Sequence, residues 1–283
     1  REAAVNAGEV DLKVLHGATD APSVGVNANG ATVVPSATYT DFTGYLSVAP
    51  GEYVFDVTPA NTPGNILAGF YGDLSTLGGG AATVFASGFL TPGDDQNGEA
   101  FGLFAALPNG DVVPLTPIGD ARAQVIHNAA DLGANTVDIY VDILRDTLKF
   151  DDVPFRGALP FADLPTGYGV DIVVAAPTSA GIADGVVATF TDTLVDGESY
   201  YMIAQGILPG NLGDYDTQTN GQGNVEFTLV IEPGAREVAD DASMFDLNVF
   251  HGTTDAPAVD ITADQGLPPL LQLAEVPPLR VLR

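Results

Sequence analysis

The sequence predicts an all-β fold: two tandem antiparallel β-sandwich domains of immunoglobulin-like size, followed by the opening of a third repeat. Three observations predict it. A short motif that begins with histidine occurs three times, and each of the three histidines in the chain begins one copy. Short apolar and aromatic segments alternate with Gly, Pro and Asn, and no long helical period occurs. Each complete repeat has about seven such segments, which suits a sandwich, with a closed barrel as the alternative.

The repeated motif spans residues 16–22, returns at residues 251–257, and appears more loosely at residues 127–131. Before each histidine, apolar and polar residues alternate, and the histidine falls on the apolar side. The apolar residues are Leu12 and Val14, then Ala123 and Val125, then Leu247 and Val249. This pattern predicts a half-buried strand that runs into a turn. The histidines lie 111 and 124 residues apart, which is the length of a domain and not of a solenoid repeat.

Further landmarks match in the same order and define the domains. The strand-like segments 53–57 and 84–90 in the first repeat correspond to 170–174 and 202–208 in the second. We therefore expect a lead-in over 1–9, a first sandwich over 10–118, a second over 119–235, a linker over 236–244 and a truncated third repeat over 245–283. Residues 142–149 are expected to form a loop or a single helical turn, because their apolar spacing is helical over too short a stretch.

The chain is strongly acidic, with a formal net charge of −28 and an isoelectric point near 4.1. Such a surface repels nucleic acids and anionic lipids, so neither is an expected partner. Aspartate greatly outnumbers glutamate, and the chain has 33 glycines and 20 prolines, as turn-rich β structure requires. The acidic excess also suits a saline medium, although solvated loop carboxylates are the simpler interpretation of most single aspartates.

Three absences bear on where the protein acts. There is no cysteine, so no disulfide is expected and the redox compartment cannot be inferred from thiols. No apolar run approaches the roughly 18 residues of a membrane span, and membrane insertion is not expected. The first residues contain neither an initiator Met nor an apolar signal segment. We expect a mature exported protein whose leader has been removed, located outside the cell or on its surface.

The motif resembles that of a secreted bacterial and archaeal repeat family, domain of unknown function 4397. The resemblance rests on alternating apolar residues, the histidine, Asp-Ala-Pro and a following valine, at Val14 to Val24 and again at Val249 to Val259. The second copy departs from the pattern, because residues 131–135 replace Asp-Ala-Pro. The resemblance implies an exported, β-rich module of the cell surface that often occurs in tandem. It implies no catalytic activity.

Histidine followed by aspartate four residues later invites a catalytic or metal-binding interpretation. Each repeat has a single such histidine, however, and neither a nucleophile motif nor a second histidine for zinc accompanies it. We therefore predict a structural role: the ring bonds the backbone of the turn, and the aspartate closes an Asx-type turn. No catalytic residue is assigned, and the structural motif comprises His16, Asp20, Pro22, His127, Asp131, His251, Asp255 and Pro257.

Acidic loops late in each repeat are candidates for calcium binding, because hard cations take several oxygen ligands from a tight loop. The candidate ligands are Asp94, Asp95, Asn97 and Glu99 in the first repeat, and Asp214, Asp216 and Asn220 in the second. The pattern lacks the closing bidentate glutamate of a calcium loop, and an ordinary acidic hairpin tip is the favoured alternative. No other cofactor is suggested.

These features favour an exported, non-enzymatic structural protein, a subunit of an extracellular filament or surface layer. The third repeat suggests the means of self-association, since an orphan strand over residues 246–250 exposes Leu247 and Val249 for β-strand addition to a neighbouring copy. The simpler alternative is a sequence that ends inside a third domain. A second hypothesis is an adhesion module whose calcium-stabilised loops recognise a glycan or a protein. A hydrolase that uses His and Asp is the least favoured.

Overall fold

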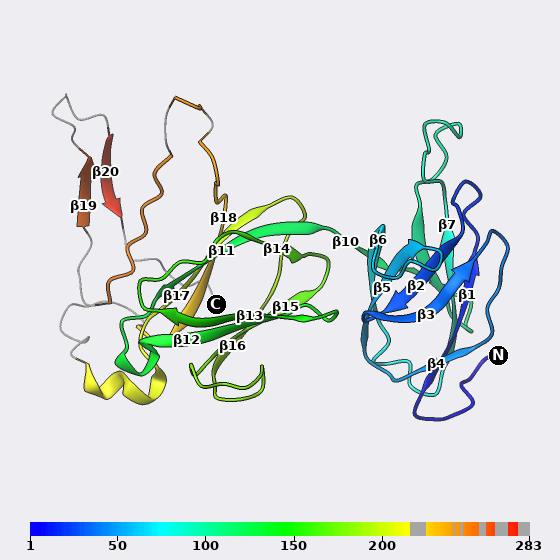
Figure 1. The fold of residues 1–283 in the computed structure, drawn as a ribbon, viewed down its shortest axis with the longest axis horizontal. Helices are drawn as coiled ribbons and strands as arrows, with labels where there is room; N and C mark the ends of the chain where they lie inside the picture. Colours follow the sequence, from blue (N-terminus) through cyan, green and yellow to red (C-terminus); the bar gives the residue numbers. More distant parts are fainter. Residues whose placement is uncertain (216–224, 240, 244–245, 255–258, 264–270, 277–283) are drawn as a thin grey trace.

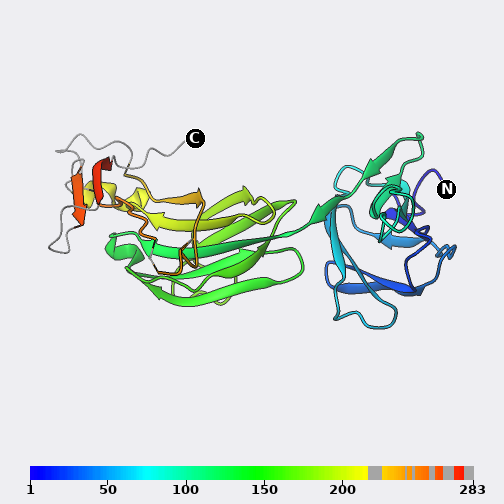
Figure 2. The same ribbon diagram turned by 90° about the horizontal axis from the view of Figure 1, so that it is seen from above.

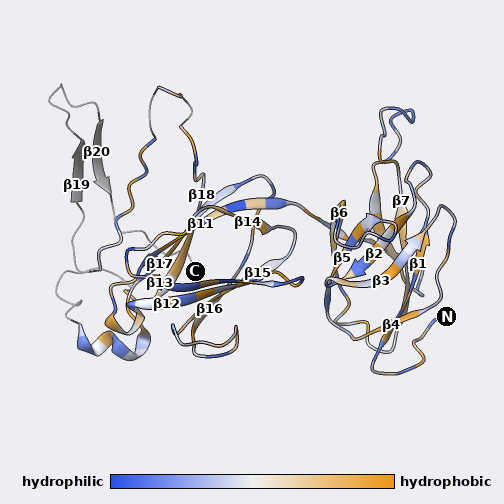
Figure 3. Cartoon of the chain, viewed as in Figure 1, coloured by the Kyte–Doolittle hydropathy of each residue, from blue (hydrophilic) through white to orange (hydrophobic). Residues whose placement is uncertain are grey.

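The fold consists of four sheets that pair face to face into two sandwiches, which confirms the all-β prediction (Figure 1). The computed structural model describes residues 1–283 except 216–224, 240, 244–245, 255–258, 264–270 and 277–283. Hydrophobic residues alternate with hydrophilic ones along the strands of both sandwiches (Figure 3), as expected when one face of each sheet is buried. In the described residues, no helix is long and apolar enough to cross a bilayer.

The first sandwich contains ten strands and pairs two five-stranded sheets of order β4-β1-β7-β8-β9 and β10-β6-β5-β2-β3. The strands are β1 Val10–His16, β2 Val24–Ala28, β3 Ala31–Ala37, β4 Leu46–Val48, β5 Glu52–Pro59, β6 Ala68–Asp73, β7 Ala81–Ser87, β8 Gly102–Ala106, β9 Val112–Pro114 and β10 Thr116–Ile118. The histidine strand β1 lies inside its sheet, between β4 and β7.

The second sandwich pairs sheets of order β14-β11-β17-β18 and β13-β12-β15-β16. Its strands are β11 Asp120–Asn128, β12 Thr136–Asp142, β13 Thr147–Pro154, β14 Ala162–Pro165, β15 Gly169–Ala175, β16 Val186–Thr193, β17 Ser199–Gln205 and β18 Thr228–Pro233. Two 3-10 helices are present, η1 Leu132–Ala134 and η2 Pro209–Asp214. A separate hairpin of β19 Val259–Ala263 and β20 Leu271–Val276 follows.

One strand pairing in each sandwich is parallel, which modifies the antiparallel expectation. β1 runs parallel to β7, with Val14 opposite Val84, and β11 runs parallel to β17, with Val125 opposite Met202. The two pairings are equivalent, because each histidine strand is matched with the same later segment of its own repeat. A parallel pair needs a long crossover, and here β2 to β6, or β12 to β16, are contained in that crossover.

Two expectations about single segments are resolved by the structure. Residues 143–146 form the hairpin turn between β12 and β13, where Leu144 has a φ of 57°, whereas residue 142 and residues 147–149 belong to the strands. The strand predicted at 246–250 is wrong for this isolated chain, since residues 246–254 contain no strand. Leu247 is 55% exposed. A strand needs a neighbour to pair its N–H and C=O groups, and no strand lies paired to this segment.

The two sandwiches meet at a packed junction. A single residue, Gly119, separates β10 from β11. The guanidinium of Arg145 lies 2.8 Å from Asp56 Oδ1, and the Asp56 side chain is 1% exposed. The rings of Tyr71 and Tyr168 stack beside this pair, with centroids 5.4 Å apart. Burial raises the pKa of Asp56, while the charge of Arg145 acts in the opposite direction. The ion pair therefore offsets the cost of burying a carboxylate between the domains.

We predict that Arg145→Met destabilises the junction, because it leaves the Asp56 carboxylate buried without its partner. Removing one member of a buried pair costs about 3–5 kcal/mol. The low end is expected, because the Arg145 side chain is 24% exposed. Urea unfolding at neutral pH measures the loss. The control is Arg122→Met, which breaks exposed ion pairs with Asp163 and Glu237 and should change stability less than Arg145→Met, because exposed ion pairs contribute little. Equal unfolding free energies for the two variants would contradict the prediction.

Candidate functional site

The candidate site is the turn that follows each histidine strand. His16 is 2% exposed, and its Nε2 lies 3.0 Å from Pro22 O. His127 is fully buried, and its Nε2 lies 2.6 Å from Ala134 O. Because a carbonyl oxygen accepts and cannot donate, Nε2 carries a proton in both rings. In each repeat the histidine thus bonds the backbone six or seven residues further on.

The same aromatic and backbone contacts surround both histidines. The ring of Tyr39 meets His16 edge-on at 6.5 Å, and Phe155 meets His127 at 6.3 Å. The next residue in each case donates its N–H to the histidine carbonyl, Thr40 at 2.9 Å and Arg156 at 2.7 Å. Both residues have positive φ, 73° and 65°. This match could not be predicted from the sequence, because non-glycine residues with positive φ have no fixed signature.

The motif aspartate of the second repeat accepts hydrogen bonds from several distant groups. Asp131 accepts from Gly133 N at 2.7 Å, which closes the Asx-type turn, and from Leu208 N at 2.8 Å. Asn211 Nδ2 and the hydroxyl of Tyr215 also donate to it. Burial alone would raise the pKa of Asp131, but these hydrogen bonds together lower it. The carboxylate is therefore held ionised and fastens the turn to the loop after β17.

The equivalent aspartate makes the same tie in the first repeat. Asp20 accepts from Thr91 N at 3.1 Å, and Thr91 follows β7 as Leu208 follows β17. Burial opposes ionisation of Asp20, but hydrogen bonds from Leu90 and Thr91 lower its pKa. In both sandwiches the motif thus joins the end of the histidine strand to the exit of its parallel neighbour. The sequence pattern located the aspartates but not their partners, more than seventy residues away.

The two histidines differ in one respect. Nδ1 of His127 accepts a hydrogen bond from Ala129 N at 3.4 Å. Nδ1 of His16 is buried and has no hydrogen-bond partner. A polar atom buried without a hydrogen-bond partner costs free energy. The first repeat bears this cost at His16 Nδ1, and the second repeat does not bear it at His127 Nδ1.

The third copy of the motif packs against the second sandwich. His251 is 8% exposed, and Asn128 Nδ2, at the end of β11, donates to Gly252 O at 3.2 Å. Asp255 and Pro257 lie outside the described residues. The third histidine is therefore buried without ending a strand as His16 and His127 do.

The acidic loops show no convergence of ligands among the described residues. Asp94, Asp95, Asn97 and Glu99 lie in the turns after β7, where Asn97 N donates to Pro92 O at 2.8 Å. Asp214 ends η2, and Asp216 and Asn220 lie outside the described part. Throughout that part, no three His, Asp or Glu side chains are placed to hold a metal ion. Calcium binding stays a prediction.

We expect Asp131→Ala to destabilise the second sandwich strongly, because Leu208 N and Gly133 N would lose their acceptor. Hydrogen bonds to a charged group contribute about 1.5–3 kcal/mol each, so a loss of at least about 3 kcal/mol is expected. The urea midpoint measures it, with the exposed Asp214→Ala as the matched control. A midpoint equal to that of the control would show that the tie contributes nothing to stability.

Stability should also fall in two steps on acidification. Burial lowers the pKa of His127 below its ordinary value of 6.5, so the unfolded chain binds more protons and stability decreases as the pH falls below about 6.5. Burial opposes ionisation of Asp138, but hydrogen bonds from Ser179, Asp152 and Lys149 lower its pKa to about 2. Its contribution, with that of Asp131, is lost between about pH 4 and pH 2.

Urea unfolding at pH 8, 5.5 and 3 tests these steps. His127→Gln should flatten the change between pH 8 and 5.5 and leave the lower step unchanged. A variant with the same profile as the parent protein would assign the upper step to another group.

The comparisons with known proteins give one family and several distant structures. No curated protein matches this chain significantly. Similar solved structures include the Bacillus anthracis TIE protein, with 10% identity over 70% of this chain and 33% of that chain and a TM-score of 0.21. The pilus adhesin SpaC from Lactobacillus rhamnosus GG has 12% identity over 71% and 31%, also with a TM-score of 0.21.

The fimbrial anchor protein Mfa2 from Porphyromonas gingivalis has 8% identity over 79% of this chain and 97% of that chain, with a TM-score of 0.23. This chain spans a third or less of the TIE and SpaC structures. A family model matches the whole first sandwich and continues through η1 of the second. Residues 10–134 of this chain match the model of the family described as Domain of unknown function (DUF4397).

Proposed function

We propose that this protein is an exported, non-enzymatic structural subunit that assembles end to end into an extracellular filament or surface layer. The observation that carries the proposal is that the segment before His251 has the sequence pattern of a histidine strand but is not paired in a sheet. Its residues repeat the alternation of β1, with Leu247, Val249 and His251 in place of Leu12, Val14 and His16. In both sandwiches this strand is paired on two sides, whereas the third copy forms no strand.

An unpaired segment with this pattern is suited to strand addition. Leu247 is 55% exposed, and the segment's backbone groups belong to no sheet. Adding the segment to the sheet of a second molecule would pair those groups and bury the apolar side chains. The contact joins two different surfaces, so it does not close on itself and grows a chain of subunits.

The geometry of the chain suits longitudinal growth. The first sandwich lies at one end of the molecule, and the hairpin β19–β20 lies at the other end, beyond the second sandwich (Figures 1 and 2). The junction at Arg145 and Asp56 holds the sandwiches together. Residues 246–254 lead to that hairpin and contact the second sandwich through Gly252, so binding of this segment to the first sandwich of another copy would add length to a filament with each contact.

The charge of the chain makes assembly dependent on salt. Each copy carries a formal charge of −28, and two such copies repel each other in dilute salt. The screening length falls from about 10 Å at 0.1 M to about 3 Å at 1 M ionic strength. Polymers should therefore form more readily in concentrated salt.

An adhesion module is the second candidate, and an apolar row on the first sandwich favours it. Phe42, Leu15, Phe85, Phe104 and Pro114 lie opposite one another in successive strands. They are on the outer face, since Val14, Val84 and Leu103 of the same strands belong to the core. Phe42 is 49% exposed, and the rings of Phe85 and Phe104 stack at 5.6 Å. An exposed ring beside a half-buried pair of stacked rings can contact the apolar face of a sugar or a protein.

The filament proposal predicts polymers of the full chain that disappear when residues 236–283 are removed. Negative-stain electron microscopy at 0.1 M and 2 M NaCl is the measurement, and more polymer is expected at the higher salt. The shortened chain should show single two-lobed particles in both salts. Polymers from the shortened chain would contradict the connector role, and single particles from both chains would favour the adhesion module.

A further inference from the structure

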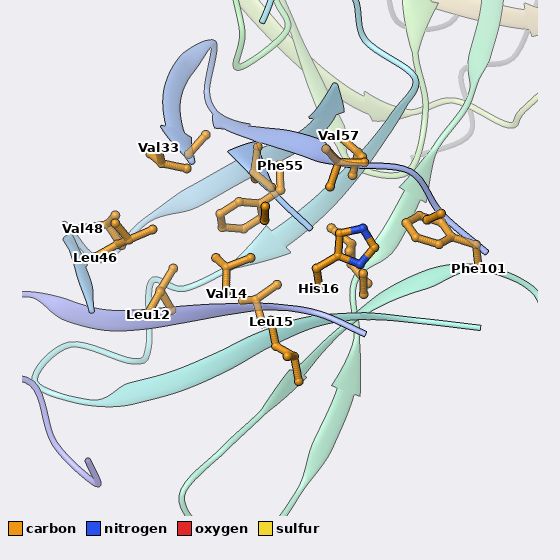
Figure 4. A pocket seen from close by; sticks show the side chains of 18 residues that line it. Leu12, Val14, Leu15, His16, Val33, Leu46, Val48, Phe55, Val57 and Phe101 are labelled. Atoms are coloured by element: carbon orange, nitrogen blue, oxygen red, sulfur yellow. The ribbon is translucent and has the colours of Figure 1, made fainter. Parts of the chain in front are cut away.

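The core of the first sandwich contains a cavity of about 40 Å³ (Figure 4). Its walls are almost entirely aliphatic and aromatic and include Leu12, Val14, Val84 and Phe55. Folded cores are packed to high density, so unfilled space of this size is unusual. By this measure a single water needs about 10–15 Å³ and two to four polar partners. The cavity is large enough for a water molecule but has few polar groups to which that water could hydrogen-bond. Methyl groups therefore suit the cavity better than water does.

The cavity extends to one side of the sandwich. Val33 and Ala37 of β3 line it, as do Leu46 and Val48 of β4. Each of these strands ends its own sheet. The space therefore lies along the seam where the edges of the two sheets meet, and an added strand would enter there.

The two edges differ in their ability to accept a strand. β3 carries Pro35 in its middle, and proline has no N–H to donate to a neighbouring strand. β4 is a three-residue strand without proline, and it pairs with β1 on one side. β4 is therefore the edge to which a further strand can bond on its open side.

His16 also borders the cavity. Its ring lines the cavity, and its Nδ1 is buried without a hydrogen-bond partner. In the second sandwich the corresponding nitrogen is bonded, and Met202 occupies the position of Val84. The second repeat thus has a longer side chain at the equivalent point of its core.

We propose that the seam between β3 and β4 is the acceptor site for residues 246–250 of a second copy. This inference rests on the proposed function and names the surface that receives the connector. Leu247 and Val249 supply aliphatic groups of the kind that line the cavity, and Asp246 and Asn248 alternate with them on the solvent side. Leu247 is exposed in the isolated chain, so docking removes apolar surface from water on both molecules.

Disulfide trapping tests this contact directly, because the native chain has no cysteine. Two full-length variants, Leu46→Cys and Leu247→Cys, are mixed in 2 M NaCl under mild oxidation, and one carries a mass tag. A disulfide needs Cβ atoms about 3.8 Å apart, so heterodimers should form only if the segment lies beside β4. The matched control is Val113→Cys on β9, 47% exposed at the opposite edge of the same sheet. At least tenfold more heterodimer with Leu46→Cys than with Val113→Cys is expected, and equal yields would overturn the proposal.

A cavity-filling variant gives an independent measurement. Val84→Met introduces the side chain that the second sandwich carries at the equivalent position, so the fold should tolerate it. Its thermal midpoint should equal or exceed that of the native chain, while the protein concentration needed for polymers rises at least tenfold. Unchanged polymer formation by a folded Val84→Met protein would overturn the proposal.

The outcomes separate the acceptor site from the function. If the native chain forms no polymers in either salt, the filament itself is wrong. If it polymerises but the cysteine pair is not trapped, the filament stands and this acceptor site is wrong.

Discussion

The parallel pairing of each histidine strand with a strand some seventy residues later is the constraint on which each sandwich depends. Val14 lies opposite Val84, and Val125 lies opposite Met202. A parallel pairing needs a long crossover, and the strands of the opposite sheet, except β10 of the first sandwich, lie within it. The motif aspartate fixes the exit of the later strand, through Thr91 in one domain and Leu208 in the other. Pairing the histidine strand with its parallel partner therefore also brings together the two sheets that form the core.

The sequence predicted the parts of this arrangement that follow from local pattern. Alternation marked β1 and β11, and repetition placed their histidines at the strand ends. The sequence contains no signal for the parallel direction of the pairing with β7 and β17, because a buried strand has the same alternation whether its neighbour is parallel or antiparallel. The partners of Asp131 were equally hidden, since a backbone N–H such as that of Leu208 has no residue signature. The strand expected at 246–250 failed for a related reason: alternation shows that a segment suits a sheet, not that an edge is present.

Comparison of the two sandwiches separates what the scaffold requires from what each copy adds. Both keep the buried histidine, the ionised aspartate and an aromatic edge against the imidazole. They differ at Val84 and Met202, and at the bonding of His16 and His127 Nδ1. Since the framework contacts are the same, the unfilled core and the unbonded nitrogen are not demanded by the fold. They are features of the first domain, and they occur together.

The first domain and the third histidine strand have complementary defects. One has aliphatic space and an edge strand without a partner; the other has an exposed leucine, Leu247, and a backbone without a sheet. Satisfying both within one chain is disfavoured because the third copy packs against the second sandwich, through Gly252 and Asn128, and not against the first. Satisfying both between two chains requires no change in either sandwich, and the cost is the approach of two highly acidic surfaces. Because salt screens that cost and strengthens apolar burial when its anion is kosmotropic, the proposed assembly would be controlled by the medium: the acidic surface would keep single subunits apart in dilute solution and let them associate in concentrated salt.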